Sequence, residues 1–308
     1  MAQRWVTASD GVRLAVYEQG GGVPGAPTVL CVHGFPDDHR VWDGVVERLS
    51  AGGRFRVVTY DVRGSGSSEV PRRTRAYRLE QLAADTTAVA DAVSPDGPVH
   101  LLTHDWGSVQ SWHTVSTPHM AHRYASITSI SGPDLDHTGH WYRAQLRRLT
   151  PARLARLAKQ SLASQYVGLF HLTGIAELAC RSGLLDAAAG TLRRRLETGE
   201  GPADYGPGLA ARNRAGLKLY RANVLPRMLR PRRREATLPA QVLAPGRDVF
   251  VLAPWQTEIT DWAPNTEVHH VDGGHWLPSH RPDLVADFTA ALVERTERTD
   301  QEKARTSA

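Results

Sequence analysis

The sequence predicts an α/β fold with a mostly parallel central sheet flanked by helices and an inserted helical cap. In the first third of the chain, short β-branched runs alternate with amphipathic stretches, which is the pattern of a parallel α/β sheet. From about Asp134 to Thr237 these runs disappear, and leucine, alanine and arginine recur at three- and four-residue spacing, as they do in helices. The α/β pattern then resumes at AQVLAPGRD. We therefore expect a core formed by residues 1–133 and 238–308 and a helical cap over residues 134–237.

The elements of the first core segment follow in a regular order. Residues 5–19, broken by the turn signal DG, predict an antiparallel hairpin that leads into the sheet. The next β runs are TVLCV, FRVVTYD, VHLLTHD and ASITSIS. Between them, residues 38–49 and 79–93 have the composition of amphipathic helices.

The second core segment contains the patterns of a strand and a helix, and it ends in a polar tail. TEVHHV reads as a strand, and residues 282–295 place their apolar positions on one helical face. The polar stretch from Glu297 onward offers no apolar face to pack. We therefore expect this tail to be frayed.

Composition places the chain among ordinary globular proteins. It has 308 residues, of which 41% are hydrophobic and 22% charged, enough for one large core. No run of about 18 apolar residues occurs, and the start lacks the layout of a signal peptide, so we expect a soluble, cytoplasmic protein with no membrane span. The two cysteines, Cys31 and Cys180, are too few for a disulfide framework or a cysteine metal site, and we interpret both as packing residues.

The net charge of +5 is concentrated in arginine clusters at Arg147 and Arg148, at 193–195 and at 230–234. Such clusters can attract anions or nucleic acid through their summed field. No nucleic-acid-binding motif accompanies them, so we interpret them as solvated helix faces and expect no nucleic-acid partner.

The segment VHLLTHDWGSVQSW predicts a strand, a sharp turn and a helix, with Asp105 at the turn. This is the layout of a nucleophile elbow, in which small residues two before and two after the reactive position relieve the strained turn. A carboxylate with a reference pKa of about 3.9 is ionised without a neighbouring base, so Asp105 can act as a nucleophile. The sequence contains no Gly-x-Ser-x-Gly, and Ser108 lies inside the helix start. The alternative is that Asp105 is only a helix N-cap.

His33-Gly34-Phe35-Pro36 ends the TVLCV strand, where a backbone N–H can turn towards the elbow. We expect the N–H groups of Phe35 and Trp106 to form an oxyanion hole. We also expect a cis Phe35-Pro36 bond, because X–Pro bonds tolerate that geometry. A tight turn containing a proline is the structural alternative.

His275 is the best candidate for a general base, because it follows a strand in the small-residue loop GGHW. Asp248, in GRDVF, is the best acid, while Glu258 and Asp261 lie deeper in the next helical stretch. Asp105, Asp248 and His275 then stand in the chain order nucleophile, acid, histidine. The alternative for Asp248 is a turn former.

One further glycine-rich segment, DVRGSGSS at 61–68, follows a strand and could be mistaken for a phosphate loop. It lacks the P-loop lysine and the spacing of a dinucleotide fingerprint. We interpret it as a structural turn.

These motifs together resemble the α/β-hydrolase-fold epoxide hydrolases over nearly the whole chain. The resemblance rests on HGFP at 33–36, DVRGSGSS at 61–68, HDWG at 104–107, GRD at 246–248 and GGHW at 273–276. It implies that two cap tyrosines, which match Tyr166 and Tyr220, donate hydrogen bonds to the epoxide oxygen. Tyr142 and Tyr205 are reserve candidates. The sequence departs from the commonest pattern at Thr103 and Ser108, where glycine is frequent. In some relatives such a domain precedes a short-chain dehydrogenase, whereas a single hydrolase domain is expected here.

The function implied by the resemblance is hydrolysis of a small hydrophobic epoxide to a vicinal diol. Asp105 would form an ester with the substrate, and water activated by His275, with support from Asp248, would hydrolyse it. This mechanism needs no metal and no organic cofactor. The rival is a haloalkane or haloacid dehalogenase. Haloalkane dehalogenases usually have an asparagine where Phe35 stands, and fluoroacetate dehalogenases usually have an arginine where Trp106 stands, so both residues argue against this rival. A non-catalytic, ligand-binding hydrolase-like protein is a second alternative. The sequence leaves open whether the chain forms a homodimer.

Overall fold

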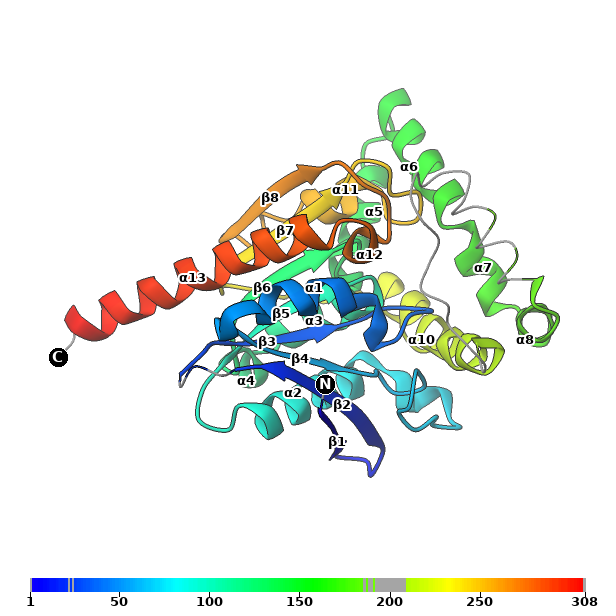
Figure 1. Ribbon diagram of the computed structural model, residues 1–308. Coiled ribbons are helices and arrows are strands. Elements are labelled where there is room, and N and C mark those ends of the chain that lie inside the picture. The colour runs from blue at the N-terminus through cyan, green and yellow to red at the C-terminus, as the bar shows by residue number, and fades with distance from the viewer. Residues whose placement is uncertain are drawn as a thin grey trace.

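The computed structural model describes residues 2–21, 23, 25–184, 187, 191 and 209–306. They form one eight-stranded sheet of order β1-β2-β4-β3-β5-β6-β7-β8 (Figure 1). The strands are β1 (Ala2–Thr7), β2 (Arg13–Gly20), β3 (Thr28–Val32), β4 (Arg56–Tyr60), β5 (Val99–His104), β6 (Tyr124–Ile130), β7 (Ala240–Pro245) and β8 (Thr266–Val271). The pairs β1–β2 and β2–β4 are antiparallel, which confirms the predicted hairpin, and all later pairs are parallel.

Helices cover both faces of the sheet and divide the core into two hydrophobic clusters. Side chains alternate along a strand, so Leu30 and Val32 of β3 belong to one cluster while Val29 and Cys31 belong to the other. The first cluster packs against α2 (Leu79–Val93) and α3 (Trp106–Val115). The second packs against α1 (Asp43–Ser50), α12 (Leu277–His280) and α13 (Pro282–Thr306). Short elements complete the core, namely η1 (His39–Trp42), η2 (Ala51–Gly53), η3 (Thr74–Tyr77), α4 (Pro118–Ala121) and α11 (Ala253–Thr257).

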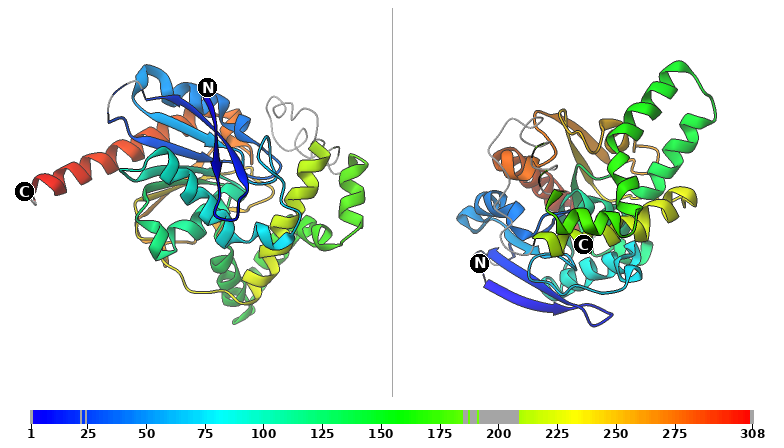
Figure 2. Two further views of the ribbon diagram at one scale, coloured as in Figure 1. Left: turned by 90° about the horizontal axis from the view of Figure 1, so that it is seen from below. Right: turned by 90° about the vertical axis from the view of Figure 1, so that its right-hand side faces the viewer.

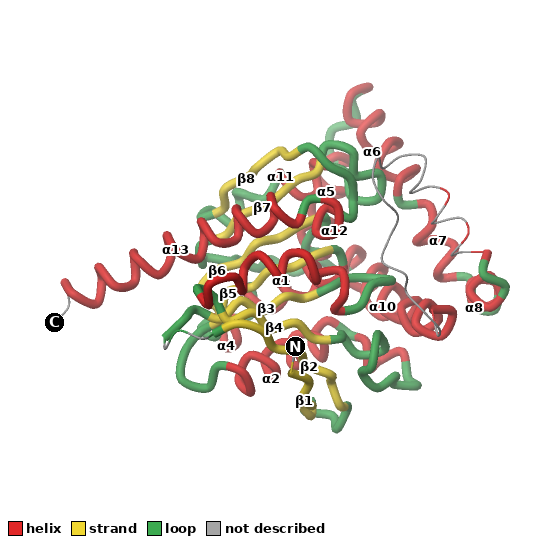
Figure 3. The backbone as a smooth tube through the Cα atoms, in the orientation of Figure 1, coloured by secondary structure: helices red, strands yellow, loops and turns green. Residues whose placement is uncertain are grey.

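Between β6 and β7, all elements that the structure describes are helices (Figure 3). They are α5 (Leu135–Leu146), α6 (Pro151–Ala163), α7 (Gln165–His171), α8 (Ile175–Arg181) and α10 (Leu209–Leu229). They lie beside the sheet at the end towards which the parallel strands point (Figure 1). The reserve tyrosine Tyr205 and the arginines at 193–195 lie outside the described residues. Within the described ranges, no helix has the length and apolarity to cross a membrane.

The expectation of a frayed tail after Glu297 is wrong, because α13 continues to Thr306 and projects from the body of the protein (Figure 2). No glycine or proline interrupts this stretch, and its Glu, Gln, Lys and Arg residues are good helix formers. At the start of this polar stretch, Glu297 Oε1 lies 3.1 Å from His100 Nε2 of β5. Local propensity, with one contact to the core, therefore maintains the helix without an apolar face.

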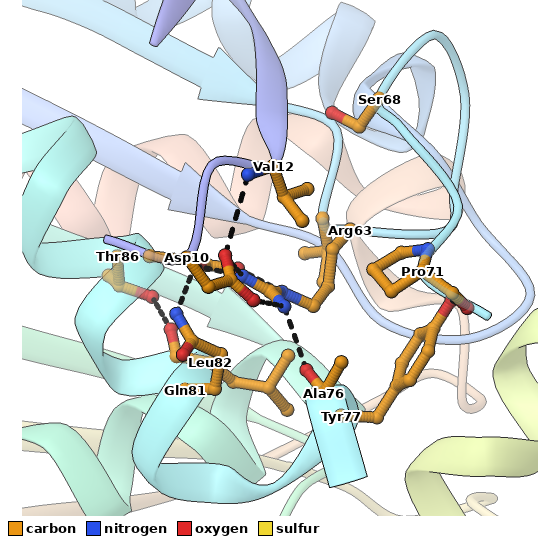
Figure 4. A network of polar contacts seen from close by, with 12 residues as sticks. Asp10, Val12, Arg63, Ser68, Pro71, Ala76, Tyr77, Gln81, Leu82 and Thr86 are labelled. Carbon is orange, nitrogen blue, oxygen red and sulfur yellow. Dashed lines mark hydrogen bonds and ion pairs between the residues drawn. The ribbon is translucent and has the colours of Figure 1, made fainter. Parts of the chain in front are cut away.

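The segment 61–68 is built around a buried arginine (Figure 4). Arg63 donates two hydrogen bonds of 2.6 Å to Asp85 of α2. It also donates at 2.8 Å to Asp10 of the β1–β2 turn and at 2.8 Å to the carbonyl of Ala76. A buried guanidinium requires such pairing, so these contacts join the hairpin and α2 to the loop after β4.

Candidate active site

Asp105 lies between β5 and α3 in a backbone conformation that non-glycine residues rarely adopt, with φ 51° and ψ −122°. The turn is tight enough that a Cβ on Gly107 would collide with the carbonyl of Val32. Thr103 and Ser108, which depart from the glycines of the resembled family, fill the turn by a hydrogen bond of 2.9 Å between their hydroxyls. The strained elbow therefore has the geometry that presents a side chain to a site.

The Asp105 carboxylate is oriented by backbone groups. Its Oδ1 accepts a hydrogen bond of 2.7 Å from the Phe35 N–H, and the backbone N–H of Trp106 also lowers its pKa. A Cβ on Gly34 would overlap the carboxylate, so the backbone can approach it this closely only at a glycine. The predicted cis Phe35-Pro36 bond is confirmed. The Phe35 N–H thus holds Oδ1, while Oδ2 lies 3.7 Å from Nε2 of His275.

The acidity of Asp105 differs from that of a free aspartate. Burial raises its pKa from 3.8 to about 6, against the opposing effects of His275 and of the Phe35 and Trp106 N–H groups. The carboxylate is therefore still mostly ionised at neutral pH, but it becomes protonated at a pH where an exposed aspartate remains charged.

His275 contacts the predicted acid. Its Nδ1 lies 3.1 Å from Asp248 Oδ2 and 3.2 Å from Oδ1. Asp248 is fully buried, and its Oδ1 accepts the N–H groups of Phe250 and Val251 at 2.9 Å. Burial opposes its ionisation, but the charge and hydrogen bond of His275 outweigh that effect, and the pKa lies below its ordinary value. The structure thus brings Asp105, His275 and Asp248 together.

The weaker acid candidates lie elsewhere. Glu258 accepts the indole N–H of Trp141 at 2.8 Å and pairs with Arg156 at 3.0 Å. It lines, together with Asp261, a separate cavity of about 640 Å³ beside α5 that contains none of Asp105, Asp248 and His275. This cavity is larger than the one at Asp105, but it lacks a nucleophile and base in contact.

Two residues near His275 were not identified from the sequence. His104, at the end of β5, has its Nε2 2.8 Å from the carbonyl oxygen of His275, and burial lowers its pKa to about 3, so it is neutral. Ser131, at the end of β6, lowers the pKa of Asp248 by a side-chain hydrogen bond. His104 stands in the HDWG motif, whereas no spacing in the sequence links Ser131 to Asp248.

The elbow opens on a mostly apolar cavity of about 380 Å³ between core and cap. Tyr166 of α7 and Tyr220 of α10 both line it, with ring centroids 6.0 Å apart. Burial raises the pKa of both phenols, and the negative charge of Asp105 raises them further. The reserve candidate Tyr142 lines the same cavity, but its pKa is raised by burial with no contribution from Asp105. The charge of Asp105 therefore affects the pKa of Tyr166 and Tyr220.

Among the described residues, one group has the ligand types to hold a metal ion, namely Asp38, His39 and Asp61. Asp38 accepts Arg40 Nη2 at 2.8 Å, and Asp61 accepts His39 Nδ1 at 2.7 Å and the Ser67 N–H at 2.8 Å. These oxygens are engaged in holding loops after β3 and β4. We therefore interpret Asp38, His39 and Asp61 as a hydrogen-bonded network that holds these loops.

The alpha/beta hydrolase fold family model matches residues 27–282, so the chain belongs to that family, as the resemblance predicted. Among its relatives is the "Probable oxidoreductase EphD" of Mycobacterium tuberculosis, 38% identical over 291 residues that cover 92% of this chain and 48% of that protein. "Epoxide hydrolase A" of the same organism is 36% identical over 127 residues, 41% of this chain and 38% of that protein. The chain spans about half the length of the EphD relatives.

Solved structures show the same fold. Epoxide hydrolase VrEH1 from Vigna radiata superposes with a TM-score of 0.70 at 21% identity, over 96% of this chain and 98% of that one. A structure described among novel epoxide hydrolases from hot-environment metagenomes gives a TM-score of 0.75 at 22% identity, over 95% and 98% of the two chains. At these identities the likeness concerns the fold.

Proposed function

We propose that this chain hydrolyses an epoxide to a vicinal diol through an ester between the substrate and Asp105. The proposal rests on the different surroundings of the two oxygens of the Asp105 carboxylate. Oδ1 is held at 2.7 Å by the Phe35 N–H, and Oδ2 lies 3.7 Å from His275 Nε2. The same carboxylate borders a cavity that contains two tyrosines whose pKa it raises. The likeness of part of the chain to a protein named epoxide hydrolase supports the proposal.

In the first half-reaction, Asp105 Oδ2 attacks a carbon of the epoxide while the bond from that carbon to the ring oxygen breaks. Negative charge develops on the ring oxygen, where Tyr166 and Tyr220 donate hydrogen bonds and supply a proton. Their raised pKa keeps both phenols protonated before the reaction. The product is an ester on Asp105.

In the second half-reaction, His275 Nε2 takes a proton from water, and the water oxygen attacks the ester carbonyl carbon. Negative charge then develops on Oδ1, the atom that already accepts the Phe35 N–H. Asp248, in contact with His275 Nδ1, stabilises the imidazolium until its proton passes to the leaving alkoxide. Collapse of the tetrahedral intermediate releases the diol and leaves one proton of the water on the Asp105 carboxyl. Return of that proton to the tyrosinate formed in the first half-reaction restores both groups.

The rival function, dehalogenation, uses the same three residues but must stabilise a leaving halide. The Phe35 ring has no hydrogen-bond donor to offer, and it packs against Tyr220 at a centroid distance of 5.8 Å. The ring of Trp106 also packs on Tyr220, at 4.9 Å. A pair of phenols suits an oxygen leaving group that takes a proton, which favours the epoxide.

The test is a turnover panel of terminal and internal epoxides, haloalkanes, fluoroacetate and aryl esters. Diol formation from at least one epoxide, without comparable turnover of the halogenated compounds, is the expected outcome. Halide release at a higher rate than epoxide opening would favour the dehalogenase. No turnover of any class, by a folded protein, would favour the ligand-binding alternative.

The cap tyrosines provide a prediction on that panel. Tyr166→Phe and Tyr220→Phe should each slow epoxide opening about ten- to hundredfold, because each removes a hydrogen bond to a charged oxygen. The double variant should lose about a thousandfold. Tyr142→Phe is the matched control, since Tyr142 lines the same cavity, and its turnover should stay near that of the wild type. Equal rates in all four variants would remove both tyrosines from the mechanism.

Because the pKa of Asp105 is raised, ester formation should slow at acidic pH. Only the ionised carboxylate attacks, so the single-turnover rate of alkylation should be constant above the pKa of about 6 and fall about tenfold per pH unit below it. Rapid-quench measurement of the adduct, with circular dichroism at each pH to verify the fold, checks this. A rate that stays level down to the pKa of an exposed aspartate would show that burial does not control the nucleophile.

A further inference from the structure

Helix α6 presents its apolar side chains to solvent. Leu154, Leu157 and Leu162 lie at positions i, i+3 and i+8, which share one side of a helix. Leu154 is 51% exposed and Leu162 is 68% exposed, while Leu157 is half-buried. We call these three leucines the α6 face.

The polar side of α6 is the side that contacts the protein. Arg153 donates to the carbonyl of Ala144 at 3.0 Å, and Arg156 pairs with Glu258 of the core at 3.0 Å. Gln160, on the same side, is 1% exposed. Leu154 and Leu162 thus face water, whereas the apolar side of an ordinary surface helix faces the core.

This orientation leaves a concentrated apolar surface in water. Leu149, in the turn that leads into α6, is 60% exposed, and α6 projects from the body alongside α5 (Figure 2, right). Single exposed leucines are common, but an exposed helix face of this kind marks an interaction surface.

The charge around the α6 face indicates an anionic partner. Residues 143–184 carry seven arginine and lysine side chains and a single acidic one, Glu177. Arg153 and Arg156 are engaged on the protein side of α6, whereas Arg147, Arg148 and Lys159 are exposed. Glu177 is already paired with Arg221. Lys159, which is exposed, borders the α6 face. A second copy of the chain would bring the same positive charge against itself, and like charges disfavour that contact.

The α6 face also adjoins the cavity at Asp105. Ser161 and Ser164, at the end of α6 and just beyond it, line that cavity, as does Gly168 of α7. An apolar compound dissolved in whatever covers the α6 face would therefore be close to the cavity wall.

We propose that the α6 face docks on an anionic lipid membrane, with the leucines inserted at the headgroup boundary and the exposed Arg147, Arg148 and Lys159 on lipid phosphates. A basic amphipathic helix that lies in the interface plane combines the same two contributions, apolar burial and attraction to anionic lipid. This docking is independent of the proposed epoxide chemistry.

Sedimentation with lipid vesicles tests the proposal. The full chain should co-sediment with vesicles of phosphatidylcholine and phosphatidylglycerol in equal amounts, and much less with phosphatidylcholine alone. Added salt should weaken binding because it screens the phosphates. The double variant Leu154→Glu, Leu162→Glu should bind the mixed vesicles at least about tenfold more weakly, since two exposed leucines no longer enter the boundary.

The matched control is Val23→Glu, because Val23 is 52% exposed on the loop after β2, in the core. It should bind the mixed vesicles as the wild type does, and both variants should keep the wild-type circular dichroism and melting temperature. Absence of wild-type binding, or equal binding to both lipid compositions, would overturn the proposal. A wild-type dimer in analytical ultracentrifugation that becomes monomeric in the double variant would instead identify the α6 face as an interface between copies.

Discussion

His275→Gln is expected to stop the reaction after its first half and to accumulate an ester on Asp105. Asp105 is mostly ionised at neutral pH despite its raised pKa of about 6, so it needs no base to attack the epoxide. Hydrolysis of the ester, however, requires a group that takes a proton from water, and glutamine cannot do so. Steady-state turnover should fall about 10²- to 10⁴-fold, while intact-mass spectrometry detects the adduct.

The mass of the adduct identifies the chemistry. Ring opening expels nothing, so an epoxide adds its whole mass, whereas a haloalkane adds its mass minus hydrogen halide. Peptide mapping should place the adduct on Asp105. His270→Gln is the matched control, because His270 is exposed on β8, and it should accumulate nothing. Unchanged steady-state turnover in His275→Gln would show that the mechanism proposed here is wrong.

Asp105→Ala is expected to abolish turnover and to leave the fold intact. Without the nucleophile no ester forms, and a loss on the order of 10⁴-fold or more is typical when a covalent nucleophile is removed. Thermal unfolding followed by circular dichroism, together with diol formation, measures both quantities.

The stability of Asp105→Ala follows from the sign of the pKa shift. The carboxyl has a pKa of about 6 in the folded protein and 3.8 as a reference, so its ionisation opposes folding at neutral pH by roughly 2–3 kcal/mol. Loss of the hydrogen bond to the Phe35 N–H offsets part of the gain. The melting temperature should therefore be equal to or above that of the wild type at pH 7. Asp96→Ala, at an exposed loop position, should change neither quantity, and appreciable activity in a folded Asp105→Ala protein would contradict the nucleophile assignment.

Much of the fold could be predicted because its determinants are local. The β-branched runs and the amphipathic spacing identified all the core strands, and the predicted helix at residues 79–93 coincides with α2. The expectation of a frayed tail after Glu297 is wrong, because a helix needs no apolar face where helix propensity and a contact such as that of Glu297 with His100 maintain it to Thr306.

The candidate site was predictable in its residue types and only partly in its geometry. The order of Asp105, Asp248 and His275 was visible in the motifs, since each follows a predicted strand and parallel strands bring their carboxyl ends to one edge of the sheet. The contribution of Ser131 to Asp248 was not visible, because 117 residues separate them in the chain and only the register of β6 and β7 makes them neighbours.

Local sequence patterns were enough to locate the strands, the carboxylate at the elbow and the helical insertion, because composition and periodicity act over a few residues. The tertiary structure decided which oxygen of Asp105 faces His275, how far burial raises its pKa, and which side of α6 meets water. These properties depend on distances between segments remote in the chain and on the solvent that those segments exclude, and neither quantity is encoded in local spacing.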